Sequence, residues 1–334
     1  MLAAADSATN LTPRGREFYA RFQKLYPAIR YSAGELSRKG WEQQAAIARL
    51  MYTRFPGVFD GAATVNAASS PAGRCIMSMS SFCLALNDCQ PSAEIYETIG
   101  RLSRDAVLPQ HSDNPFRVKV EKDSLGFTES WEEYIERTVD YRAILGRIFL
   151  NTDRTLKPEE QWDFLYYLNF FAHGMPSLDT DLQFIDLFTF DEQVAMWKID
   201  CFQFYCYGWQ VRTGYRPIVD HLISAADGRI ASGARGADLR FGHDTSFLPL
   251  LMVLGVNGYD HLCTDGDEIP VWCEMNDVPM AANLQFVFYR NPGHDILFKM
   301  LLNGEEARLP LESDIWPYYR WEDFKAWWAG KAGE

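Results

Sequence analysis

The sequence predicts an α/β protein in which a mixed, mainly parallel sheet is flanked by helices and a helical domain is inserted. Three observations support this class. A strand, a polar turn and a helix follow one another within residues 63–88, strand patterns return after residue 235, and the stretch between has aromatic-rich helical periodicity. The expected layout is an α/β domain formed by residues 1–88 and 235–334, with an inserted helical domain at 89–234.

Two helices are expected before the first strand. Thr12 and Pro13 provide an N-cap and a proline at the first helical position. Ser37 opens the second helix, in which Ile47 and Leu50 recur at helical spacing. Both helices therefore have a start signal and an apolar face.

A short strand at residues 63–66 leads through a Ser-Ser-Pro turn into a helix that carries Arg74. In α/β folds the turn after a parallel strand lies at the edge of the sheet where ligands bind. A guanidinium there, beside the free amides of a helix start, suits a phosphate group. The alternative for Arg74 is a surface arginine in a weak ion pair.

From about Cys89 to Ala234 strand alternation is absent, and helical patterns cover 131–149, 160–171 and 191–209. Their aromatic side chains are expected to form core. Beyond this region the strand pattern returns at 239–241 and 284–288. Residues 295–302 and 305–311 should form a hairpin across Asn303-Gly304, followed by a C-terminal helix at 316–328.

The formal net charge of −13 disfavours a nucleic-acid or anionic-membrane partner, because a phosphate backbone requires clustered lysine and arginine. The longest apolar run, 247–256, is half of what a bilayer span requires, so a soluble protein is expected. Residues 1–10 lack the basic flank and apolar core of a signal peptide. Of the seven cysteines, Cys263 and Cys273 lie in a polar stretch where a bridge is plausible, and buried thiols are expected at Cys75, Cys83, Cys201 and Cys206.

His243 and Asp244 stand together where a predicted strand meets an apolar helix. Gly242 before them permits a close backbone approach, and Thr245-Ser246 can cap the following helix. An imidazole in such a crevice can donate a hydrogen bond to a phosphoryl oxygen, and a carboxylic acid can protonate a departing alkoxide. The alternative is that the pair is a surface or capping feature.

Taken together, these segments resemble the histidine acid phosphatases, the second branch of the histidine phosphatase superfamily, and within them the bacterial multiple inositol polyphosphate phosphatases. The resemblance covers nearly the whole chain and is weakest across the helical insertion. The segments that carry it are 11–15, 34–40, 69–75 with 81–82, 239–245, 280–290 and 309–321.

The resemblance implies a histidine phosphatase-like fold and a two-step phosphoryl transfer. A histidine of an Arg-His-Gly-x-Arg motif attacks phosphorus, a phosphohistidine forms, and water releases phosphate. On this sequence it implies that Arg74 clamps phosphoryl oxygens, His243 contacts phosphate and Asp244 protonates the leaving oxygen. The implied partner is a small phosphate monoester, an inositol polyphosphate such as phytate, and no metal or other cofactor is needed. The full-length parent would be periplasmic or secreted, and the oligomeric state stays open.

The Arg-His-Gly motif is absent: none of the six histidines follows an arginine and precedes a glycine. Either the chain begins late, so that the first strand and the nucleophile are missing, or it is a pseudo-enzyme that binds phosphate without turnover. We favour the truncated form, because Arg74, His243 and Asp244 are all retained. An isolated chain of this kind should have little or no activity. A third hypothesis is a metal-dependent HD phosphohydrolase, in which His243, Asp244 and a residue such as His221 would bind a metal.

A polyanionic substrate also needs a local basic cluster. Inositol polyphosphate relatives often carry a basic residue where this chain has Ala68. The remaining candidates are Arg14, Arg38, Lys39 and Arg290, for each of which a solvated surface charge is the alternative.

Overall fold

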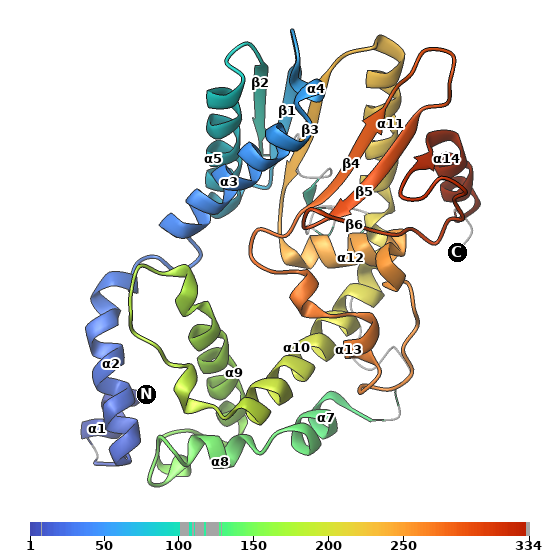
Figure 1. The fold of residues 1–334 in the computed structure, drawn as a ribbon. Helices are drawn as coiled ribbons and strands as arrows, with labels where there is room; N and C mark the ends of the chain where they lie inside the picture. The colour runs from blue at the N-terminus through green and yellow to red at the C-terminus, as the bar shows by residue number, and fades with distance from the viewer. Residues whose placement is uncertain are drawn as a thin grey trace. The chain divides into compact units, whose positions relative to one another are not determined.

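The structure is a computed structural model of the 334-residue chain and describes residues 1–7, 9–100, 107–108, 110, 117, 127 and 129–331. The chain divides into two compact units, each formed by two segments. Unit 1 comprises Met1–Trp41 and Thr128–Asp200, and unit 2 comprises Glu42–Phe127 and Cys201–Glu334. Figure 1 labels the helices and strands of both.

Unit 1 is helical. Its elements are α1 (Leu2–Ser7), α2 (Pro13–Ile29), α7 (Trp131–Thr138), α8 (Tyr141–Leu145), η1 (Thr152–Arg154), α9 (Pro158–Gly174), η2 (Met175–Ser177) and η3 (Ile185–Leu187). Two other helices, α3 (Arg38–Arg54) and α10 (Phe190–Val211), contribute residues to both units.

The two predicted helix starts of the N-terminal segment are confirmed. The Thr12 hydroxyl accepts a hydrogen bond from the Gly15 amide at 2.9 Å, with Pro13 as the first residue of α2. The Ser37 hydroxyl accepts one from the Gly40 amide at 3.1 Å. Each hydroxyl therefore satisfies an amide that the first helical turn leaves without a partner.

Unit 2 contains a three-stranded parallel sheet in the order β2–β1–β3, made of β1 (Thr64–Ser69), β2 (Glu94–Ile99) and β3 (Gly236–Phe241). Its helices are α4 (Pro56–Phe59), α5 (Gly73–Cys89), η4 (Arg212–Tyr215), α11 (Arg216–Ser232), α12 (Asp244–Leu254), η5 (Val256–Gly258), α13 (Ile269–Trp272), η6 (Met275–Asp277) and α14 (Trp321–Gly330). Figure 1 shows α3 and α5 beside this sheet.

Helices cover both faces of the parallel sheet. Val65 and Ala67 of β1 point to one face, where they are buried against residues of α3 and α5. On the opposite face, Asn66 donates a hydrogen bond to Asp238 at 2.8 Å, and Asp238 is in turn held by Arg229 of α11. The predicted class, an α/β protein with a parallel sheet flanked by helices, is confirmed.

A second sheet follows near the C-terminus. It consists of β4 (Leu284–Tyr289), β5 (Leu297–Leu302), β6 (Glu305–Glu306) and β7 (Tyr319–Arg320), with β5 antiparallel to each of the other three. Asn303 and Gly304 form the β5–β6 turn with φ of 53° and 91°, as the Asn-Gly signal predicts. Phe298 of β5 packs on Trp321 and Phe324 of α14.

The compact units are bounded differently from the predicted domains. Residues 94–99 were expected inside the helical insertion but form β2, which pairs with β1 along its whole length. Most of its residues are exposed, so the strand lacks the apolar alternation that would reveal it. The N-terminal helices were expected in the α/β domain, whereas residues 1–41 pack with 128–200: Leu11 forms a bridge with Phe149.

Further boundaries also differ. The helix expected at 131–149 is two helices, because Asp140 caps α8 by accepting a hydrogen bond from the Ala143 amide at 3.0 Å. The C-terminal helix begins at Trp321 rather than at residue 316. All seven cysteines lie among the described residues and are free, Cys263 and Cys273 included. Among the described residues, none of the helices has the length and apolar character to cross a membrane. Residues 101–106 and 118–126 of the expected insertion lie outside the described part.

Candidate phosphate site

The carboxyl ends of β1 and β3 meet at one edge of the parallel sheet in unit 2. Ser69 of β1 pairs with Phe241 of β3, and the Ser70 amide donates a hydrogen bond to the Phe241 carbonyl at 3.0 Å. The chain leaves β1 into α5 and leaves β3 into α12, so both helices begin at this edge. The free amides and positive dipole ends of two helix starts favour an anion here.

His243 joins the two strand exits. Its Nε2 lies 3.0 Å from the Ser70 hydroxyl, and its Nδ1 lies 3.1 Å from a terminal nitrogen of the Arg74 guanidinium. Because a guanidinium only donates hydrogen bonds, Nδ1 must be the acceptor. The imidazole is then neutral, with its proton on Nε2 and directed at the Ser70 oxygen.

The backbone fixes the position of His243. It is the N-cap residue of α12 with φ −129° and ψ 157°, and its carbonyl accepts hydrogen bonds from the amides of Ser246 and Phe247 at 3.0 and 2.9 Å. The expectation that Thr245 and Ser246 cap this helix is wrong, because α12 begins at Asp244 and includes both. Ser246 is buried, and its hydroxyl accepts a hydrogen bond from Tyr215 at 3.4 Å.

The surroundings of His243 favour its neutral form. Burial lowers the pKa of the imidazole, and the positive charge of Arg74 lowers it further, while Asp244 acts in the opposite direction. A neutral ring with one lone pair and one N–H can exchange its present partners for an anion. At the point where β1 and β3 end, His243 therefore offers an N–H group that can leave its present partner and donate to a bound anion.

Asp244 is the first residue of α12, and one of its carboxyl oxygens accepts a hydrogen bond from the Thr245 amide at 2.8 Å. Arg74 is the second residue of α5, and its side chain is exposed. The structure thus brings Arg74, His243 and Asp244 to one edge, although 169 positions separate Arg74 from His243.

Two further side chains belong to this cluster. Ser70 is fully buried, and Cys75 donates a hydrogen bond from its thiol to the Gly242 carbonyl at 3.1 Å, with its sulfur 3.9 Å from both ring nitrogens of His243. Burial raises the pKa of the Cys75 thiol, which keeps it protonated. From the sequence, Ser70 was expected in a turn and Cys75 among the buried thiols, and neither was expected to act at the site. The signal for Ser70 was its position in the polar turn between the predicted strand at 63–66 and the following helix.

The other basic candidates lie elsewhere. Arg14, Arg38 and Lys39 belong to unit 1, where Arg14 donates to the Asp186 carbonyl, Arg38 lies 3.8 Å from Asp179, and Lys39 donates to the carbonyls of Pro176 and Leu178 at 3.0 and 2.8 Å. In unit 2, Arg290 donates to the Ile230 carbonyl. Each is engaged within its own unit.

The HD hypothesis does not fit the geometry. His243 follows a parallel strand in extended conformation rather than lying in a helix. Among the described residues, His243 and Asp244 belong to no group of three clustered potential metal ligands. His221 is engaged by Arg240, whose guanidinium lies 2.7 Å from its Nδ1.

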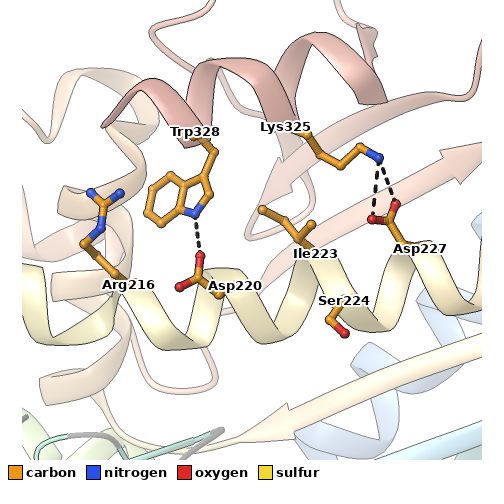
Figure 2. A pocket seen from close by; sticks show the side chains of 8 residues that line it. Arg216, Asp220, Ile223, Ser224, Asp227, Lys325 and Trp328 are labelled. Carbon is orange, nitrogen blue, oxygen red and sulfur yellow. Dashed lines mark hydrogen bonds and ion pairs between the residues drawn. The ribbon is translucent and has the colours of Figure 1, made fainter. Parts of the chain in front are cut away.

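A separate groove of about 580 Å³ lies between α11 and α14 (Figure 2). Its acidic groups already have partners: Asp220 accepts a hydrogen bond from the Trp328 indole at 2.7 Å, and Asp227 is bonded by Lys325 at 3.2 Å. None of Arg74, His243 and Asp244 lines it. The groove contains none of the residues that the sequence singles out, and the strand edge remains the candidate site.

Solved structures share this fold. A Bifidobacterium longum multiple inositol polyphosphate phosphatase in complex with phosphate matches at 16% identity and TM-score 0.77, over 99% of this chain and 87% of that chain. The same enzyme in complex with inositol hexasulfate matches at 15% identity and TM-score 0.76 with the same coverage. A phytase from D. castellii matches at 14% identity and TM-score 0.66, over 96% of this chain and 76% of that chain. No protein-family model matches the sequence, and no curated protein does. At such identities the likeness concerns the fold.

Proposed function

We propose that this chain is a phosphomonoester hydrolase of the histidine acid phosphatase type, acting on inositol polyphosphates such as phytate. The observation that carries the proposal is the contact of Arg74 with His243 at 3.1 Å, at a sheet edge where two helices begin. Fold likeness to enzymes solved with phosphate and with inositol hexasulfate supports the same substrate class. The parent protein is proposed to act in the periplasm or outside the cell.

Substrate binding would begin with an exchange of partners. The phosphoryl group takes the place of the His243 ring at the Arg74 guanidinium, whose paired N–H groups match two phosphoryl oxygens. His243 is then free to donate a hydrogen bond to a phosphoryl oxygen in place of its bond to Ser70. Amides at the starts of α5 and α12 add positive potential. Positive charge from these groups would stabilise the transition state without a metal.

Asp244 is proposed to protonate the leaving alkoxide. Its carboxyl group adjoins His243 at the same edge, and its present partner is the exposed amide of Thr245. An alkoxide is a poor leaving group until it gains a proton, so an acid at this position accelerates departure by about 10²- to 10⁴-fold.

The group that would attack phosphorus is not among Arg74, His243 and Asp244. The resemblance assigns it to a histidine of an Arg-His-Gly motif, and no such tripeptide occurs in the 334 residues. His243 does not suit this role as placed, since its one lone pair faces Arg74. This absence favours a second candidate function, a phosphate-binding protein without turnover.

One set of measurements on this chain separates the two functions. Phosphate release from phytate is followed together with binding of inorganic phosphate. An alkaline denaturing quench traps a phosphohistidine, which is stable in base and is identified by its loss in acid. Release with a trapped phosphohistidine supports the hydrolase, and binding without release supports the second candidate. Absence of both binding and release would refute both functions.

A further inference from the structure

A second cluster of reactive side chains lies in the loop that follows α12. His261, Cys263 and Glu268 each offer one donor atom, and these three atoms lie within 4.8 Å of one another. The His261 Nε2 is 3.2 Å from a Glu268 carboxyl oxygen. The proposed phosphatase function uses none of the three.

The loop around this cluster is held by specific contacts. The Tyr205 hydroxyl of α10 accepts a hydrogen bond from the Cys263 amide at 2.8 Å and donates one to the His261 carbonyl at 3.0 Å. The other Glu268 oxygen accepts a hydrogen bond from the Thr264 amide at 3.1 Å. The His261 ring stacks on Trp272, with 4.1 Å between ring centroids. The donors therefore sit on a fixed backbone before any ligand arrives.

We propose that His261, Cys263 and Glu268 bind a single Zn²⁺ ion. Thiolate, imidazole and carboxylate together suit zinc, whereas Mg²⁺ and Ca²⁺ prefer oxygen ligands alone. Zinc bond lengths place neighbouring ligand atoms of a tetrahedral site about 3.3–3.8 Å apart. The imidazole nitrogen and the carboxyl oxygen, 3.2 Å apart, lie within about 0.1 Å of this range, and the cysteine sulfur needs to move by no more than about 1.5 Å from its 4.8 Å limit.

Binding of one Zn²⁺ ion releases one proton. The Cys263 thiol loses its proton to the buffer as the zinc–sulfur bond forms, and the neutral imidazole and the carboxylate bind without further loss. Water fills the coordination position that the three side chains leave open. Cys263 is buried, while His261 and Glu268 are each about one-third exposed, so the ion has access from solvent.

This site is separate from the candidate phosphate site. Asp244 begins α12 and Leu254 ends it, and an 11-residue helix is about 16 Å long. The cluster comes after that far end. Zinc there would link residues 261 and 268 across the loop and stabilise the exit of α12, rather than take part in phosphoryl transfer.

The test is titration of the metal-free chain with Zn²⁺ by calorimetry in two buffers of different ionisation enthalpy. One equivalent of zinc and release of one proton are expected. Co²⁺ in place of zinc should give a thiolate-to-cobalt charge-transfer band in the near ultraviolet. Binding without proton release, or cobalt binding without this band, would overturn the assignment of Cys263 as a ligand.

Variants identify the ligands. Cys263→Ser and Glu268→Gln should each weaken zinc binding at least about tenfold, and Cys263→Ser should abolish the cobalt band. Cys83→Ser removes a buried thiol of α5, and His294→Gln removes an exposed histidine of the β4–β5 turn. Both controls should bind zinc as the parent chain does. Glu268→Gln alters a partly exposed side chain, so it tests the site even where Cys263→Ser fails to fold. Unchanged affinity in Glu268→Gln would refute the three-ligand site.

Discussion

Replacement of Arg74 by alanine should weaken binding of inorganic phosphate by about tenfold. A hydrogen bond to a charged group contributes about 1.5–3 kcal/mol, and the exposed position of Arg74 favours the lower end because solvent screens the charge. About 1.4 kcal/mol corresponds to a factor of ten in affinity. The two helix starts and His243 remain in the variant, so binding should weaken rather than vanish.

The assay is a phosphate titration at constant ionic strength, followed by NMR of the His243 ring. Arg49→Ala is the matched control, because Arg49 is an exposed arginine of the same unit, on α3 and 3.8 Å from Asp88. The control should keep the parent affinity. Equal phosphate affinity in Arg74→Ala and in the parent chain would refute the role of this guanidinium.

The same NMR experiment gives a second readout. The positive charge of Arg74 lowers the pKa of His243 in addition to the effect of burial. Arg74→Ala removes that charge, so the pKa of His243 should rise while staying below its ordinary value, since burial persists. A purely structural role for Arg74 would not predict this direction, and an unchanged pKa of His243 would contradict the contact seen here.

Three further outcomes are expected. The pKa of His243 is lowered in the folded chain, so the unfolded chain takes up the proton first and stability should decrease as pH falls through about 6.5. Urea unfolding of the parent and of His243→Gln tests this. Equal slopes of unfolding free energy against pH would contradict it. Gly236→Ala should cost about 3 kcal/mol of stability or prevent folding, because φ is +132° and a Cβ would lie 1.8 Å from the Thr64 carbonyl oxygen. Gly228→Ala, in open space on α11, should instead stabilise the chain by up to about 1 kcal/mol. Equal melting temperatures of the two variants would oppose this. Where the parent chain releases phosphate from phytate, Asp244→Asn should lower this release at least about 10²-fold with phosphate affinity retained, and unchanged release would exclude its role as the acid.

The strand-to-helix junctions of the site could be predicted from sequence because their signals are local. Polar residues after an apolar strand, followed by a helical pattern, locate Arg74 and His243 at the carboxyl ends of strands. The side chains that hydrogen-bond His243 were harder to predict from the sequence. Ser70 engages His243 only because the ends of β1 and β3 lie side by side, and that adjacency is a property of the sheet rather than of either segment.

The edge strand β2 and the unit boundary were missed for a related reason. β2 is largely exposed, and its stability comes from backbone pairing with β1, which leaves no apolar alternation in its sequence. The N-terminal helices pack with residues 128–200 through long-range contacts such as Leu11 with Phe149. Periodicity reports which face of an element is buried and not which distant segment buries it.

The geometry of the site depends on the register of one parallel strand pair. A shift of β3 by two residues would keep the same side chains on each face but would move His243 about 6.6 Å along the strand, which breaks its bonds of 3.0 and 3.1 Å to Ser70 and Arg74. Apolar burial alone does not prevent such a shift. Two specific features do: Asn66 pairs with Asp238 and bonds its carboxylate at 2.8 Å, and Gly236 lies opposite Thr64, where a side chain would collide with the carbonyl. Asn66, Asp238 and Gly236, which have no proposed contact with phosphate, therefore fix the strand register on which the site depends.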